Sequence, residues 1–77
     1  MTYGELVRSA RKRKGMSQVA LAEAMGYGGK SVMVGQKLIS TIENGRGPFG
    51  PRITTRKSIG RILGIDLEGN PVENSGD

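Results

Sequence analysis

The feature that most constrains the fold is a series of short segments with helical periodicity, each followed by a glycine. Apolar residues in these segments recur as they do on one face of an amphipathic helix. A glycine directly after such a segment is a common helix stop, because glycine adopts the left-handed conformation at little cost. The pattern predicts an all-α fold, a compact bundle of four or five short helices. The segments are residues 2–14, 18–25, 36–44 and 54–63, and the glycines are Gly15, Gly26, Gly45 and Gly64.

Two of these helices also carry a start signal. Thr2 and Glu5 have the spacing of a capping box, in which a hydroxyl and a carboxylate each bind a backbone N–H of the first turn. Ser17 stands where an N-cap residue is expected for the second segment. These signals place the starts of the first two helices within a residue or so.

Cysteine and histidine are both absent from the 77 residues. The chain therefore has no disulfide, no thiolate, no imidazole base and no cysteine or histidine ligand for a metal. We expect no hydrolase or metalloenzyme, no cofactor and no small-molecule ligand. No apolar run approaches the roughly 20 residues that cross a bilayer, and the N-terminus lacks the apolar core of a signal peptide. A single, soluble, intracellular domain without a membrane partner is expected.

Positive charge is concentrated in the first part of the chain. All 12 Lys and Arg residues lie within residues 1–63, whereas residues 64–77 contain four acidic residues and no basic one. A basic body with an acidic tail suits a polyanion such as DNA, RNA or an anionic membrane, although many basic proteins bind none of these. Near this change in composition we place a boundary between a folded domain, residues 1–67, and an acidic, flexible tail, residues 68–77.

The glycine-rich stretch GYGGKSVMVGQ, residues 26–36, raises the possibility of a phosphate-binding loop. Gly29-Lys30-Ser31 matches the end of the pattern G-x-x-x-x-G-K-[ST], but Ala24 stands where that pattern has its first glycine. Such a loop also follows a buried strand, whereas a predicted helix precedes this one. The stretch is better interpreted as a connection between two helices, and an enzyme that uses it is not expected.

Two segments together resemble one known family. Residues 15–26 read GMSQVALAEAMG, and residues 34–45 read VGQKLISTIENG. They are similar to the signatures G-L-S-Q-x-x-L-A-x-x-x-G and V-S-x-x-x-I-S-x-I-E-N-G of the lambda-repressor-like helix-turn-helix family, which includes the Cro proteins and XRE-type regulators. Met16 replaces the usual Leu, and Gly35 replaces the usual Ser. The apolar residues of the predicted fourth helix also have the spacing of that family, so the resemblance covers most of the chain.

The distance between the two signatures departs from the family. Its glycine and the isoleucine of its recognition helix are usually about five positions apart, but Gly26 and Ile39 are 13 apart. About eight extra residues, Tyr27 to Val34, therefore enlarge the turn of the helix-turn-helix. A surface turn grows at small entropic cost, and the two helices keep their crossing angle if Val34 still reaches the core. The enlarged turn either contacts DNA or projects away from it.

The resemblance implies a recognition helix that begins near Gly35 or Gln36 and lies in the major groove. In a helix-turn-helix this second helix presents its N-terminal residues to the edges of the bases. A glutamine matches adenine, a lysine matches guanine, a serine donates or accepts, and a threonine adds a methyl contact with thymine. A merely polar helix surface would carry the same residue types. The predicted base-reading residues are Gln36, Lys37, Ser40 and Thr41.

A second set of residues is predicted to contact phosphate. Gln18, first in the second helix, matches the family position that binds a phosphate, and helix N-termini favour anions. The other candidates lie in the enlarged turn, at the end of the recognition helix and on the first helix. In that order they are Lys30 and Ser31, Asn44 and Arg46, and Arg11 and Arg13. Glu43, which is acidic beside the expected polyanion, is interpreted as a structural residue that pairs with Arg8 or Arg11.

The function that the resemblance implies is a sequence-specific transcriptional regulator that binds double-stranded DNA, a repressor or Cro-like protein of phage or prokaryotic type. We expect a homodimer on DNA, because family members often dimerise so that two recognition helices meet neighbouring half-sites. The alternative is an antitoxin-like or adaptor protein whose main partner is another protein, bound through the acidic tail with Leu67 and Val72.

Overall fold

The computed structural model describes residues 2–45 and 51–72. Four helices form the fold in these ranges. A short 3-10 turn, η1 (Gly29–Ser31), leads directly into the third helix. Within the described ranges the backbone contains no strand, only one isolated antiparallel bridge between Ile65 and Pro71. The predicted all-α fold is confirmed. The helices are α1 (Tyr3–Arg13), α2 (Gln18–Ala24), α3 (Val32–Glu43) and α4 (Ile53–Leu63).

The structure contains the helix caps that the sequence predicts. The Thr2 hydroxyl accepts a hydrogen bond from the Glu5 N–H at 3.2 Å, and the Glu5 carboxylate accepts one from the Thr2 N–H at 2.9 Å, which completes the capping box of α1. The Ser17 hydroxyl accepts from the Ala20 N–H at 3.0 Å and caps α2. Gly45 follows α3 with a φ of 67°, the left-handed conformation predicted for it.

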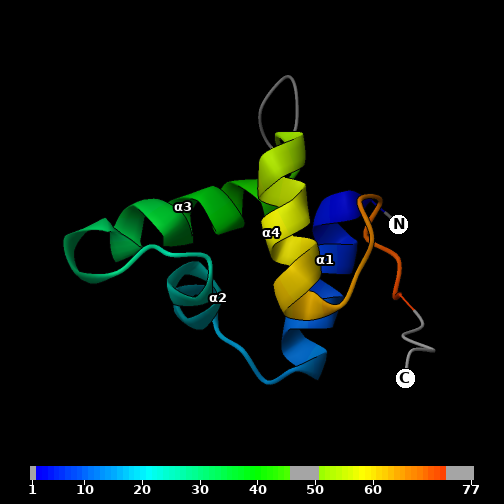
Figure 1. Cartoon of the computed structure of the whole chain (residues 1–77), viewed down its shortest axis with the longest axis horizontal. Helices are drawn as coiled ribbons and strands as arrows, with labels where there is room; N and C mark the ends of the chain where they lie inside the picture. Colours follow the sequence, from blue (N-terminus) through cyan, green and yellow to red (C-terminus); the bar gives the residue numbers. More distant parts are fainter. Residues whose placement is uncertain (1, 46–50, 73–77) are drawn as a thin grey trace.

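One apolar core joins the four helices. α3 packs mainly on α2 and α1, and α4 covers α1 and part of α2 (Figure 1). Each helix contributes one fully buried large side chain, and Ile62 and Leu63 of α4 also lie against or in the core. This core decides which side of α3 faces the body and which faces solvent. The four side chains are Val7, Leu21, Ile39 and Ile59.

The start of α3 corrects the sequence prediction. We expected this helix to begin near Gly35 or Gln36, with Tyr27 to Val34 forming an enlarged turn. α3 begins at Val32 instead, and the connection from α2 consists of residues 25–31. The connection is still longer than the 3–4 residues of an ordinary helix-turn-helix, but three of the extra residues form the first turn of α3. Val34 does not reach the core, because its side chain is 62% exposed.

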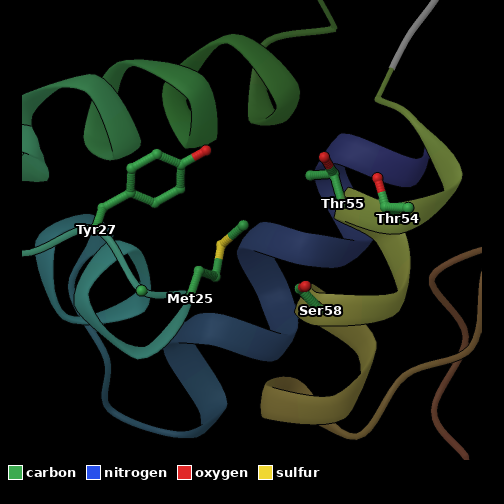
Figure 2. A pocket seen from close by; sticks show the side chains of 6 residues that line it. Met25, Tyr27, Thr54, Thr55 and Ser58 are labelled. Carbon is green, nitrogen blue, oxygen red and sulfur yellow. The ribbon is translucent and has the colours of Figure 1, made fainter.

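Tyr27 and Gly35 explain why the helix begins so early. The ring of Tyr27 points from the connection toward α3 (Figure 2) and packs against the core there, as does Val32. Gly35 is buried at this contact, where a Cβ would lie 2.6 Å from Cγ of Tyr27 and 2.8 Å from Cβ of Ala22. Glycine therefore allows α3 to lie close to α2 and Tyr27. In the sequence the same glycine indicates a helix boundary, because glycine inside a helix normally costs about 1 kcal/mol.

Arg56 of α4 lies over an aromatic ring. Its guanidinium is 4.4 Å from the centroid of the Tyr3 ring. It also donates hydrogen bonds to the carbonyl oxygens of Leu67 at 2.7 Å and Pro51 at 3.3 Å. Burial raises the pKa of Tyr3, and the Arg56 cation opposes that rise. A cation over an aromatic face is favourable, so Arg56 joins α4 to α1 and to the segment that follows α4.

The segment after α4 folds back onto the domain. The Val72 N–H donates to the carbonyl oxygen of Gly64 at 2.9 Å, beside the bridge described above. Gly69 is buried so close to α1 that a Cβ on it would lie 2.9 Å from Cβ of Leu6. The boundary that we proposed at residue 67 therefore falls inside a packed turn. The end of the proposed flexible tail, residues 73–77, lies outside the described residues, as does Arg46.

Candidate nucleic-acid interface

The outward face of α3 carries the four residues predicted to read bases. Lys37 is exposed, and the other three, Gln36, Ser40 and Thr41, are partly buried at the sides of the helix. Lys37, Thr41 and Asn44 are spaced i, i+4 and i+7, so they form one stripe opposite the buried side of the helix. The structure leaves this stripe open to a ligand. The base contacts themselves stay predictions.

Two exposed apolar residues continue this face beyond the predicted set. Met33 is 66% exposed and Val34 is 62% exposed, and both belong to the first turn of α3. Sequence reasoning assigned them to the connection, because Gly28, Gly29 and Gly35 flank them and glycines usually interrupt helices. No local signal in the sequence identifies them as part of α3.

A buried ion pair fixes the end of α3 to α1. The side chain of Glu43 is 0% exposed. Its Oε2 accepts a hydrogen bond from Nε of Arg11 at 2.7 Å, and its Oε1 accepts one from Nη2 of Arg11 at 3.1 Å. Nε of Arg8 also donates to Oε1, at 3.3 Å. The predicted pairing of Glu43 with Arg8 or Arg11 is confirmed, and the two-pronged geometry with Arg11 is the strong form of such a pair.

Arg11 therefore has a structural role in place of the predicted phosphate contact. The residue is only 9% exposed. Besides its two bonds to Glu43, its Nη1 donates to the carbonyl oxygen of Met16 at 2.9 Å. All three nitrogens of its guanidinium donate hydrogen bonds within the protein. We therefore no longer propose Arg11 as a phosphate contact.

Gln18 belongs to the same cluster. Its Nε2 donates to Oε1 of Glu43 at 3.2 Å, so this one carboxylate links α1, α2 and α3. Burial opposes the ionisation of Glu43, but hydrogen bonds from Arg11, Gln18 and Arg8 outweigh burial and lower the pKa of Glu43. The negative charge of α3 is thus held inside the protein. Gln18 remains partly exposed at the start of α2, and its phosphate contact stays a prediction.

The comparison with protein families decides what kind of domain this is. A family model described as a helix-turn-helix domain matches residues 2–68, which is most of the chain. The chain belongs to the helix-turn-helix domain family. Such domains bind DNA through the second helix of the motif, which here is α3, with α2 as the first. Membership therefore indicates a DNA-binding regulator. No curated protein and no solved structure gives a match.

Asn44 and Arg8 lie where the helix-turn-helix ends. Asn44 is exposed just after α3, where its Nδ2 donates to the Ser40 hydroxyl at 3.3 Å. Its Oδ1 accepts from Nη2 of Arg8 at 3.4 Å. The network orients Asn44 beside a predicted base-reading residue, and Arg8 brings a cation to the same end of α3. Sequence reasoning had assigned Arg8 only to Glu43.

The turn that precedes α3 is also polar and basic. Lys30 and Ser31 are exposed in η1, directly before α3. The Ser31 hydroxyl donates to the carbonyl oxygen of Gly28 at 2.8 Å, so its proton is used within the turn while its oxygen can still accept. On another helix, Arg13 is exposed at the end of α1. Phosphate contacts by these three residues stay predictions.

A shallow pocket of about 210 Å³ lies between the connection after α2 and the start of α4 (Figure 2). Its volume is below the roughly 300 Å³ at which small-molecule sites usually begin, and we assign it no ligand. In the part of the chain that the structure describes, no group of three or more acidic side chains could hold a metal ion. No helix in that part is long and apolar enough to span a membrane. The pocket is lined by Met25, Gly26, Tyr27, Thr54, Thr55 and Ser58.

Proposed function

We propose that the chain is a sequence-specific regulator of transcription that binds double-stranded DNA, a Cro- or XRE-type repressor of phage or prokaryotic origin. In this proposal α3 enters the major groove and α2 lies across the DNA backbone. The observation that supports it most is the outward face of α3. From Gln36 onward that face is polar and carries the exposed Lys37, and Glu43, the acidic residue of α3, is buried and paired.

The proposed contacts follow from the order of residues along α3. Gln36 and Lys37 come first and would meet adenine and guanine edges, and Ser40 and Thr41 come one turn later. Phosphates would be contacted around this face by residues from α2, η1 and the ends of α1 and α3. That outer group consists of Gln18, Lys30, Ser31, Asn44 and Arg13, and we add Arg8 because it donates to Asn44.

A homodimer on DNA is part of the proposal. Two copies related by a two-fold axis would place their recognition helices about 34 Å apart, one turn of B-DNA. Such a dimer would favour operators with two inverted half-sites. The folded domain would act as the DNA-binding unit, and the acidic residues at its end would stay clear of the duplex.

Selection from a pool of random duplexes, followed by affinity measurements at fixed salt, tests this function. We expect one preferred sequence, bound at least about 10³ times more tightly than random duplex. Lys37→Ala should relax the preference at one position, with a loss of about 1–3 kcal/mol there. Lys57→Ala, which removes an exposed charge from α4, is the matched control and should keep the preferred sequence.

Two results would contradict the proposal in different ways. Equal affinity for selected and random duplexes would remove sequence-specific regulation altogether. Uniformly weaker binding of Lys37→Ala to every sequence would instead make Lys37 a phosphate contact.

The alternative is an adaptor or antitoxin-like protein that binds another protein through the segment after α4. Leu67 and Val72 are 38% and 52% exposed on that segment, which leaves them available for such a contact. Salt dependence separates the two functions. In a plot of the logarithm of DNA affinity against the logarithm of salt concentration, the affinity should fall with a slope of about 0.9 for each phosphate neutralised. The affinity of an apolar protein contact should change little with salt.

A further inference from the structure

The first turn of α3 presents an apolar pair that the proposed function does not use. Met33 and Val34 are consecutive, and each is more than 60% exposed. Single exposed apolar residues are common on protein surfaces. These two differ because they lie together on the helix whose other outward residues are proposed to read DNA.

The pair lies on the same side of α3 as Lys37. Met33 precedes Lys37 by four residues and Val34 precedes it by three, so both are its neighbours on the helix surface. The buried side is marked by Gly35 and Ile39, which face α2 and the core. Figure 1 shows the start of α3 at one edge of the molecule, beyond α2 and far from α4. Nothing in the described chain covers the pair.

The surroundings of the pair are basic. Lys30 is exposed before it, and Lys37 is exposed after it. The segment from η1 to the end of α3 has Glu43 as its acidic residue, and that side chain is fully buried. Two lysines beside an apolar pair complement the major groove, where phosphates line the rims and apolar groups occur on the floor. An apolar protein surface would have to desolvate the two ammonium groups.

We propose that Met33 and Val34 form an additional base-reading contact, in which they pack against the C5-methyl group of thymine. This inference rests on the proposed function, because it needs α3 in the major groove. Thymine is the base that displays a methyl group there. Met33 lies about 4.5 Å before Gln36 along the helix axis at 1.5 Å per residue, close to the 3.4 Å step between bases. The methyl group read by the pair belongs to the base pair next to those contacted by Gln36 and Lys37.

Uracil replacement tests the contact on the wild-type protein. Uracil differs from thymine only by lacking the C5-methyl group, so each thymine of the selected duplex is replaced in turn and the Kd is measured. Uracil at one or two neighbouring positions beside the Gln36 and Lys37 contacts should weaken binding about fourfold each, the effect of losing one buried methyl group.

A double variant assigns the effect to the pair. Met33→Ala combined with Val34→Ala should bind the thymine and uracil duplexes equally at those positions, while its preference elsewhere stays unchanged. Val72→Ala removes an exposed apolar side chain from the segment after α4, which lies across the molecule from the start of α3 (Figure 1), and should keep the full uracil effect.

Several results would overturn the inference. They are a selected sequence without a thymine preference at those positions, a wild-type protein insensitive to uracil, and a double variant that keeps the wild-type sensitivity. Each of these would leave sequence-specific binding intact. Equal affinity for all duplexes would contradict both the proposed function and this contact. A DNA-free dimer in sedimentation that the double variant dissociates would make the pair a protein interface instead.

Discussion

At the level of single residues, Glu43 is the group whose polar contacts join three helices. It receives hydrogen bonds from Arg11, Arg8 and Gln18, which come from two other helices. Such a buried pair is not by itself a large source of stability, but removing one partner leaves the other charge buried without compensation. Glu43 therefore holds α3 at a fixed angle on α1 and α2.

Protonation of Glu43 should weaken the fold. Its pKa is lower in the folded state than the ordinary value of 4.5. The unfolded chain therefore binds this proton more readily, and the stability that Glu43 contributes is present above about pH 4.5. That stability is lost as the pH falls through the lower, folded pKa. The Thr2 hydrogen bonds likewise lower the pKa of Glu5, so some acid sensitivity is independent of Glu43.

Glu43→Gln tests this account through its dependence on pH. At pH 7 we expect the variant to lose about 3 kcal/mol of unfolding free energy, because Arg11 keeps a buried charge without its counterion. The difference from wild type should shrink between about pH 5 and pH 3, where the wild-type carboxylate becomes protonated. Urea unfolding at several pH values measures both effects. Glu23→Gln, on the exposed side of α2, is the control and should change stability by less than about 0.5 kcal/mol. A difference that stays constant over this pH range would refute the assignment.

Neighbouring residues of one type can have different roles, and the sequence does not distinguish them. Arg11 and Arg13 lie two positions apart on α1, so they point in different directions. Arg11 is buried on Glu43, whereas Arg13 is exposed. Both were predicted to reach phosphate, because the acceptor that occupies Arg11 lies on another helix, more than 30 positions along the chain.

At the level of the elements, the contact between Tyr27 and Gly35 decides where α3 begins. The aromatic ring fills the space in which a side chain at position 35 would otherwise lie. The family resemblance leads one to expect Ser at this position, but the extra residues of this chain bring Tyr27 against it. Glycine is therefore required by packing here and not by a turn.

Gly35→Ala should destabilise the protein by about 1–3 kcal/mol, although alanine is the better helix former. The added methyl group would overlap the Tyr27 ring and Cβ of Ala22. In a Tyr27→Ala background the same substitution should cost clearly less, because part of the overlap is gone. A double-mutant cycle of unfolding free energies measures this coupling. Stabilisation by Gly35→Ala in the wild-type background would show that α3 does not approach α2 as described.

The elements that the sequence predicts well are those with local signals. The capping box at Thr2, the cap at Ser17 and the left-handed Gly45 each depend on residues within one turn, and all three are confirmed. The start of α3 depends on a ring packed from outside the helix, which no local pattern encodes. Likewise, the position of Arg56 depends on Tyr3, more than 50 residues earlier. The base contacts predicted on α3 stay predictions, and the sequence could not show that Met33 and Val34 belong to the same helix.

At the level of the whole molecule, the acidic segment after α4 is separated from the basic turn before α3. The acidic segment after α4 lies across the molecule from the start of α3 (Figure 1). Asp66 is held there by hydrogen bonds that its carboxylate accepts from the N–H groups of Glu68 and Asn70. A charge distribution of this kind orients the protein in the field of a polyanion. It favours an approach with α3 toward the duplex.

The central claim, that the outward face of α3 lies in the major groove, is tested most directly by methylation interference on a selected duplex. Methyl groups on guanine N7 project into the major groove, and those on adenine N3 project into the minor groove. We predict that N7 methylation blocks binding within each half-site while N3 methylation there has little effect. Interference confined to adenine N3, or none at all, would contradict the claim.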